Sequence, residues 1–536
     1  MELKMISSLA KVFHDEIPTD AEVGLIEGFV NETLSFQLAF TDNYTYFAKI
    51  AADFPLRIRA VHQIPAYIPL PDDHDDYILR KPPGLFPDRL TDVKDGIFHV
   101  CAGQWRSLWI DIENADPGLY TVNFQIFNMN DGKEIATKDI KVEIYPVALP
   151  PQMLKQTKWF SAGCLAEYYN VEPFSERHWG ICESFIQTAV KRGINMILTP
   201  SFTPPLDTAV GAERITTQLI DVKIENGNYS FCFNALQRWI EMCFRCGAEY
   251  IEFAHLFTQW GAKAAPKIMA TINGEYKQIF GWETDALGDG YKKFLSAYLT
   301  SLVKLINKLK IKDKCYFHIS DEPGVFGESP EQYKAAIEFV EPYLKDFKII
   351  DALSDIDYFK TGIIRFPVPD THKVEEFLKV GMVEPWTYYC GFHYKKVSNL
   401  LVYMPSARNR IFGVQLYKFR IEGFLHWGYN WYSTWHNYMN INPYASIDQF
   451  GTWGGDAFQV YPGSDGNPEE SIRHMVFAQA LYDMRALQML ESLTNRDFVL
   501  DLIGEPMTFE DYPHGDEYIL DLRSRVNYEI IRRVHE

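Results

Sequence analysis

Long apolar segments are missing from the sequence. Hydrophobic residues make up 47% of the 536 residues, yet no run of about 18 apolar residues occurs. The first residues, MELKMISSLAKVFHDEIP, include Asp15 and Glu16 and contain no apolar stretch of signal-peptide length. The sequence therefore predicts a cytoplasmic protein that does not enter a membrane.

Positive charge is also scarce. The chain has 52 Lys and Arg against 71 Asp and Glu, which gives a formal net charge of -19. Binding to nucleic acid or to an anionic membrane requires an excess of basic side chains. The composition therefore argues against both partners and favours a neutral or cationic small substrate. It does not fix the number of subunits, and a homodimer is among the expected states.

Cysteine is sparse and scattered. Eight Cys in a chain of this length do not form the dense framework of a small secreted protein, so reduced thiols are expected. Cys243 and Cys246 form the single CxxC, and no second pair follows at zinc-ligand spacing. Ordinary helix packing is the predicted role of these two residues.

The pattern that is present begins with antiparallel strands. Apolar residues alternate through 122–126 and again through 140–144, and Asp131-Gly132 between them is a hairpin-turn pair. We predict an antiparallel β-sandwich over residues 1–150. The segment Ala148-Leu149-Pro150-Pro151 then interrupts the pattern, because proline cannot donate to a sheet ladder.

Beyond this boundary, short apolar strands alternate with amphipathic helices, which is typical of parallel β/α units. Eight candidate strands follow: KWFSAG near 158, NMILTP near 195, YIEFAH near 250, CYFHIS near 315, FKIID near 347, GIIRF near 362, EPWTYY near 384 and GFLHWG near 423. Eight such units predict a TIM (β/α)8 barrel over residues 151–460, whose active site would lie at the carboxyl ends of the strands. Residues 461–536 are predicted to be a helical segment packed on the barrel as an appendage.

Two long connections follow the second and third strands, and both contain an Asn-Gly turn. Asn226-Gly227 and Asn273-Gly274 predict β-hairpins. Because these connections follow strands, the hairpins are expected on the face where barrel enzymes work.

The strongest candidate for chemistry is Asp321-Glu322, near the end of the fourth strand. Neighbours in a regular strand point to opposite faces, so both carboxylates share a pocket only where the pleat breaks, as Pro323 and Gly324 suggest. Crowding and burial would raise one pKa and leave the other group ionised. The alternative is that the two residues cap the helix beginning near 329. His318, earlier in the strand, is predicted to be a core residue.

These residues and several other stretches resemble glycoside hydrolase family 123, the substrate-assisted β-N-acetylgalactosaminidases. The resemblance covers nearly the whole chain. Its matching stretches are NETLSFQLAF at 31–40, KIMATINGEYKQIFGW at 267–282, SDEP at 320–323, GFLHWGYNWY at 423–432, GGDAFQVYPG at 454–463 and Ser471-Ile472-Arg473.

The resemblance implies removal of β-linked N-acetylgalactosamine, or a related 2-acetamido sugar, with retention of configuration. The substrate's acetamide oxygen attacks the anomeric carbon, so no protein nucleophile is needed. Glu322 matches the general acid/base. Asp321 matches the residue that orients the acetamide N–H and stabilises an oxazolinium-like intermediate.

A sugar also needs apolar walls and hydroxyl partners. The residues predicted to bind it are Trp386, Tyr388, Trp427, Tyr429, Asn430, His255, Trp260 and Asp456. The chain contains 37 Phe, 31 Tyr and 12 Trp, most of which must fill cores, so a core position is the competing interpretation for each named aromatic.

Two other functions compete. One is a conventional retaining glycosidase with Glu322 as acid/base and Glu384 as nucleophile, although Glu384-Pro385 begins the seventh strand instead of ending it and would lie on the opposite face. The other is a non-catalytic carbohydrate-binding protein, since a fold alone does not prove catalysis. No cofactor is expected, and KWFSAG lacks the His-x-His of many metal hydrolases, so no metal is expected either.

Overall fold

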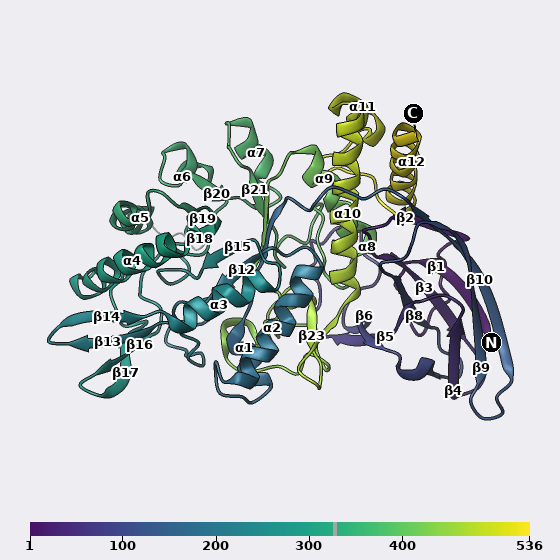
Figure 1. Cartoon of the computed structure of the whole chain (residues 1–536), viewed down its shortest axis with the longest axis horizontal. Coiled ribbons are helices and arrows are strands. Elements are labelled where there is room, and N and C mark those ends of the chain that lie inside the picture. The colour runs from purple at the N-terminus through teal and green to yellow at the C-terminus, as the bar shows by residue number, and fades with distance from the viewer. Residues whose placement is uncertain (325–329, 536) are drawn as a thin grey trace.

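The computed structural model of the chain describes residues 1–324 and 330–535. A mixed α/β molecule results, with two β-sheets at the amino end and a parallel barrel after them (Figure 1). Within the described residues, no helix combines the length and apolar character needed to cross a membrane.

The first region consists of two five-stranded sheets. The first has the order β1 (Glu2–Ser7), β3 (Leu34–Thr41), β8 (Arg106–Ile112), β5 (Arg57–Ala66) and β6 (Gly84–Asp92), and the second the order β2 (Leu25–Phe29), β10 (Glu134–Tyr145), β9 (Gly118–Asn128), β4 (Tyr46–Ala52) and β7 (Ile97–Val100). All neighbours are antiparallel except β2 and β10. Buried apolar residues such as Phe36, Ile110 and Phe124 fill the core of this region. The predicted hairpin at Asp131-Gly132 joins β9 to β10.

The barrel has eight strands, and each predicted segment overlaps one of them, although KWFSAG and GIIRF share only Lys158 and Phe366 with the strands observed there. The eight strands are β11 (Lys155–Lys158), β12 (Met196–Thr199), β15 (Tyr250–Phe253), β18 (Cys315–Phe317), β19 (Lys348–Ala352), β20 (Phe366–Val368), β21 (Trp386–Tyr388) and β22 (Gly423–His426). They pair in parallel in chain order, and β22 pairs with β11. Between β20 and β21 a parallel bridge joins Asp370 to Tyr388, which nearly closes the barrel.

Helices cover the outside of the barrel. They are α1 (Ala162–Tyr168), α2 (Glu176–Lys191), α3 (Asn234–Arg245), α4 (Asp289–Leu309), α5 (Pro330–Leu344), α6 (Ile356–Lys360), α7 (Val374–Lys379), α8 (Ser406–Arg410) and α9 (Phe412–Lys418). In α2, for example, Ser175 caps the first turn by accepting from His178 N, and Ile181, Phe185 and Ile186 lie buried on one face. Single 3-10 turns occur at Lys94–Gly96, Lys312–Lys314 and Trp435–Asn437.

Both predicted Asn-Gly hairpins are present. β13 (Asp221–Glu225) pairs with β14 (Asn228–Cys232), and β16 (Ile268–Ile272) pairs with β17 (Glu275–Phe280). In each turn the Asn and the Gly adopt positive φ, as a tight two-residue turn requires. The two hairpins join through β13 and β16 into one four-stranded sheet beside the barrel (Figure 1).

The last part of the chain is more central than an appendage. After a short antiparallel pair, β23 (Val460–Pro462) and β24 (Pro468–Glu470), the chain forms α10 (Ile472–Leu493), α11 (Arg496–Ile503) and α12 (Asp516–His535). Most residues of α10 are buried. This helix stands between the barrel and the amino-terminal sheets (Figure 1), where its apolar residues join one core with residues from both regions.

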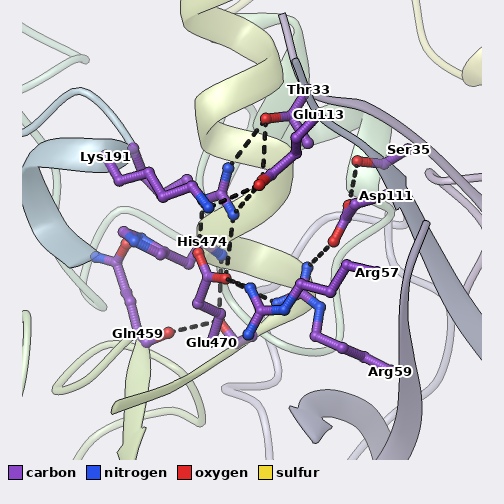
Figure 2. A network of polar contacts seen from close by, with 12 residues as sticks. Thr33, Ser35, Arg57, Arg59, Asp111, Glu113, Lys191, Gln459, Glu470 and His474 are labelled. Carbon is purple, nitrogen blue, oxygen red and sulfur yellow. Dashed lines mark hydrogen bonds and ion pairs between the residues drawn. The ribbon is translucent and has the colours of Figure 1, made fainter. Parts of the chain in front are cut away.

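Buried ion pairs between side chains also connect the two regions (Figure 2). Glu470 accepts from Arg59 at 2.8 Å and from Arg192 at 2.6 Å, and Arg59 also donates to Asp111 at 2.6 Å. Burial alone would raise the pKa of Glu470, but Arg192 and Arg59 hold it well below its usual range. Breaking such a pair leaves an uncompensated buried charge, so this network resists separation of the two regions.

Candidate active site

A cavity of about 480 Å³ opens at the carboxyl ends of the barrel strands. Its wall combines apolar and aromatic side chains with five carboxylates, and among the described residues it includes no Lys or Arg. The carboxylates are Asp207, Asp321, Glu322, Asp370 and Asp456. A concave, mostly apolar site with a few convergent polar groups is the usual form of a small-ligand pocket.

Asp321 and Glu322 both line this cavity. The strand β18 ends at Phe317, and Glu322 has a φ of 41°, in the left-handed region that a non-glycine residue seldom adopts. The expected break in the pleat is therefore present, and it lets two neighbours face one space. Backbone hydrogen bonds fix the turn, including one from Trp260 N to Asp321 O at 2.7 Å.

The acidity of both groups is perturbed. Burial, followed by the charge of Glu322, raises the pKa of Asp321 well above its usual range. Burial also raises the pKa of Glu322, against a hydrogen bond from Tyr388 that lowers it. That hydrogen bond joins Tyr388 OH to Glu322 Oε1 at 2.6 Å. The pair therefore holds a proton at higher pH than isolated carboxyl groups would.

An ion network forms the floor beneath the pair. His318 contacts Glu252 through Nε2 at 2.6 Å and Asp351 through Nδ1 at 3.1 Å, and all three side chains are fully buried. Burial lowers the pKa of His318, but hydrogen bonds to Asp351 and Glu252 outweigh this effect and raise it to about 9. An imidazolium thus lies under the cavity, and its charge opposes the rise in the pKa of Asp321.

This floor also contains a set of possible metal ligands. His255, His318 and Asp351 each offer one ligand atom within 4.8 Å of the others. Both ring nitrogens of His318, however, are engaged by carboxylates. A ligating histidine must be neutral and present a free nitrogen lone pair, so the observed contacts fit an ion network.

Trp427 and Asp456 form a second polar corner of the cavity. Trp427 Nε1 donates to Asp456 Oδ2 at 2.8 Å, and His426 Nε2 lies 3.4 Å from Asp456 Oδ1. Asp456 is only 2% exposed, so its carboxylate is held in a defined orientation. The corner presents a fixed acceptor beside an aromatic wall.

Sequence reasoning missed two carboxylates of the wall, Asp207 and Asp370. Burial raises the pKa of Asp207 to about 6, although Arg214 opposes this effect. At Asp370, burial is outweighed by the nearby side chains of His393 and Ser354, which lower the pKa to about 2, and His393 Nε2 lies 3.7 Å from Asp370 Oδ1. Both residues lie in irregular segments after strands, where no motif marked them.

The structure brings together part of the predicted sugar-binding set. Tyr388, Trp427, Trp260 and Asp456 line the cavity together with Asp321 and Glu322. Four other predicted residues, Trp386, Tyr429, Asn430 and His255, are absent from its wall.

These four side chains have core contacts instead. Trp386 begins β21 and packs against Tyr316 and Gly423 at the amino end of the barrel. Tyr429 donates to Phe185 O at 2.9 Å, and Asn430 exchanges two hydrogen bonds with the backbone of Ser161. His255 is 3% exposed and stacks on His318 at 4.3 Å. The competing core interpretation therefore describes their positions.

Glu384 is not part of the cavity wall either. It precedes β21, and its carboxylate pairs with Lys348, the first residue of β19. Both residues lie at the amino ends of parallel strands, opposite the face that holds Glu322. The alternative of Glu384 as nucleophile is therefore wrong.

Comparisons with known proteins identify the family. The model of the glycoside hydrolase 123 catalytic domain matches residues 159–490, more than half of the chain. No curated protein matches. Similar solved structures include a Bacteroides ovatus GH5 xyloglucanase in complex with a heptasaccharide (9% identity, 90% of this chain and 100% of that chain, TM-score 0.28). A Ruminococcus gnavus β-glucuronidase in complex with uronic isofagomine is another (10% identity, 88% and 72%, TM-score 0.32).

The family match begins directly after β11, covers the other seven barrel strands and most of α10, and includes Asp321, Glu322 and Asp456. The chain belongs to glycoside hydrolase family 123 and is a glycoside hydrolase.

Proposed function

We propose that the protein removes β-linked N-acetylgalactosamine, or a related 2-acetamido sugar, with retention of configuration. The observation that carries the proposal is the adjacent pair Asp321 and Glu322, which face one cavity from a turn that breaks the strand pleat. Adjacent carboxylates suit two different tasks on one sugar ring.

In the first step, Glu322 donates its proton to the glycosidic oxygen as the bond to the anomeric carbon breaks. The acetamide oxygen of the same sugar attacks that carbon and forms an oxazolinium-like intermediate. Asp321 accepts the acetamide N–H and stabilises the positive charge. In the second step, the Glu322 carboxylate takes a proton from water, which attacks the anomeric carbon and releases the sugar with its original configuration.

The protonation states support this division of work. The raised pKa of Glu322 keeps a proton available for the leaving group, and the hydrogen bond from Tyr388 stabilises the carboxylate that remains. A bound acetamide N–H would favour the charged form of Asp321, in addition to the imidazolium of His318 below. In well-oriented intramolecular reactions, holding the reacting group in place lowers the activation barrier by about 7–11 kcal/mol. Fixing the acetamide beside the anomeric carbon would give the enzyme this kind of gain.

The cavity wall suits an uncharged sugar. Trp427 offers an aromatic wall beside Asp456, which can accept hydrogen bonds from hydroxyl groups. Trp260 and Tyr388 line the same space. We retain these four residues as the proposed contacts of the sugar.

A different carboxylate must be tested as a nucleophile. Asp370 lines the cavity, and its lowered pKa keeps it ionised. It is therefore the residue that a conventional double displacement would use on the catalytic face, in place of Glu384.

The test is hydrolysis of p-nitrophenyl 2-acetamido-2-deoxy-β-galactoside, its gluco epimer and the 2-hydroxy galactoside. Wild type is compared with Asp321→Asn, Glu322→Gln, Asp370→Asn and the matched control Glu384→Gln. We expect activity on acetamido substrates alone, with kcat reduced by about 10²–10⁴-fold in Glu322→Gln. We expect a loss of similar size in Asp321→Asn and normal kcat in Glu384→Gln. Hydrolysis of the 2-hydroxy substrate with an essential Asp370 would establish double displacement instead.

A further inference from the structure

The Ser471-Ile472-Arg473 stretch has no part in the chemistry proposed above, yet Arg473 is one of the most constrained side chains in the molecule. It lies in the first turn of α10 and is only 2% exposed. A fully buried guanidinium requires partners for its charge and its donors. Those partners come from two separate parts of the chain.

The first partner belongs to the amino-terminal sheets. Arg473 Nε and Nη2 donate to the two oxygens of Asp88 on β6, each at 2.9 Å. Asp88 also accepts from Tyr461 OH at 2.6 Å and is fully buried. This bidentate contact fixes the plane of the guanidinium as well as its position.

The second set of partners is the backbone on both sides of Asp456. Arg473 Nη1 donates to Gly455 O at 2.6 Å, and Nη2 donates to Phe458 O at 2.9 Å. Gly455 has a φ of 104°, and a Cβ at this position would lie 3.2 Å from Arg473 Nη1. The guanidinium therefore approaches this backbone as closely as a glycine allows.

The opposite side of Asp456 is equally restricted. A Cβ added to Gly391 would lie 2.8 Å from Asp456 Oδ2, and one added to Gly428 would lie 2.4 Å from Asp456 O. The carboxylate is thus confined between the loops after β21 and β22, and Arg473 braces its backbone from behind.

We propose that Arg473 and Asp88 are positioning residues for Asp456, so that the amino-terminal sheets take part in sugar recognition through this chain of contacts. The inference deepens the proposed function and rests on the role of Asp456 as a sugar-binding group. Loss of the brace lets the 455–458 backbone relax, and the carboxylate then meets the sugar hydroxyls less well. Binding of the sugar weakens more than the proton transfers at Glu322 do.

The experiment compares Arg473→Lys, Asp88→Asn and Tyr461→Phe with a matched control, Glu113→Gln. Glu113 also belongs to the ion network between the two regions, where it accepts from Lys191 at 2.8 Å and from Arg192 at 3.2 Å, but it contacts neither Arg473 nor the 455–458 backbone. All variants are measured for KM and kcat on the acetamido substrate and for Tm in the full-length protein. We expect a rise in KM on the order of tenfold in Arg473→Lys and Asp88→Asn, with a smaller change in kcat. Glu113→Gln should lower Tm without changing KM.

A double-mutant cycle separates positioning from general destabilisation. Asp456→Ala should raise KM, and adding Arg473→Lys to it should have no further effect on KM, because the group that Arg473 positions is already absent. If Arg473→Lys does not fold, Asp88→Asn and Tyr461→Phe provide the same cycle. Additive effects, or a rise in KM in Glu113→Gln equal to that in Arg473→Lys, would overturn the inference.

The two proposals fail in different ways. If Asp456→Ala leaves KM unchanged, the sugar-binding role of Asp456 is wrong, and any effect of Arg473→Lys on KM must act elsewhere, which also overturns the positioning role. If Asp456→Ala raises KM while Arg473→Lys and Asp88→Asn do not, the sugar contact stands and the positioning role alone is wrong.

Discussion

The catalytic pair Asp321 and Glu322 in the cavity and Glu470 at the interface between the barrel and the amino-terminal sheets have pKa values shifted in opposite directions, although burial acts to raise the pKa in both places. At the interface, Glu470 is surrounded by guanidinium groups, and its pKa lies well below the usual range. In the cavity, Asp321 and Glu322 line one space, the described part of the wall holds no Arg or Lys, and both pKa values are raised. Burial alone does not make a carboxylate reactive; the difference lies in whether a permanent cation accompanies it.

Removing the charge of Glu470 should give the largest effect on stability. In Glu470→Gln, the buried Arg59 and Arg192 lose their counter-ion, so the free energy of unfolding should fall by about 3–5 kcal/mol. Denaturant unfolding at pH 7 measures this loss, and kcat per folded molecule should stay at the wild-type value.

The pH dependence of this difference provides a second check. Because the folded pKa of Glu470 is depressed, its contribution is fully present above the unfolded pKa of about 4.3 and is lost as the pH falls toward the folded pKa. The difference in the free energy of unfolding between wild type and Glu470→Gln should therefore become smaller at acid pH. A gap that stays constant with pH would mean that charge pairing is not its cause.

A smaller effect is expected at the hydrogen bond that moderates Glu322. In Tyr388→Phe, the carboxylate loses its phenolic donor, so the pKa of Glu322 should rise further. The acid form of Glu322 then persists to higher pH, and the alkaline limb of the kcat/KM profile should shift to higher pH. At the optimum, kcat/KM should fall by about tenfold, the equivalent of one hydrogen bond to a charged group. A shift of the alkaline limb to lower pH would show that the titration of another group causes this limb.

The smallest expected effect has the opposite sign to that of Glu470→Gln. Asp321→Asn removes one of two mutually repelling carboxyl groups, so the protein should become more stable by about 0.5–1 kcal/mol while losing activity. Thermal unfolding at pH 7 measures the gain. A loss of stability as large as that of Glu470→Gln would show that the carboxylate of Asp321, like that of Glu470, stabilises the folded protein.

The sequence predicted the barrel well because its signals are local. Most of the eight strands are short apolar runs between turn and helix signals, although β11 is polar, and both Asn-Gly turns occur where they were expected. The catalytic pair was recognisable for the same reason, because Asp321 and Glu322 are neighbours followed by Pro323 and Gly324. The sequence also placed Glu384 at the beginning of the seventh strand, and β21 begins two residues later at Trp386.

The remaining parts of the site depend on direction and distance, which one sequence does not contain. Trp386 and Tyr388 are two residues apart on β21, yet one packs at the amino end of the barrel and the other lines the cavity. Asp207 and Asp370 come from irregular segments whose paths are set by loops elsewhere in the chain. The central position of α10 was missed because its apolar residues contact both regions, which a prediction made segment by segment treats as separate.

The placement of α10 also changes what the proline boundary near residue 150 means. A break in pattern along the chain usually suggests two modules that could be expressed apart. Here a barrel expressed alone would keep Arg192, Glu470 and Arg473 but would lose their partners Arg59, Asp111 and Asp88. The apolar residues of α10 that pack on the amino-terminal sheets would be exposed to water. The boundary in the sequence is therefore not a boundary between independent contacts in the folded molecule, and we expect the two regions to unfold together.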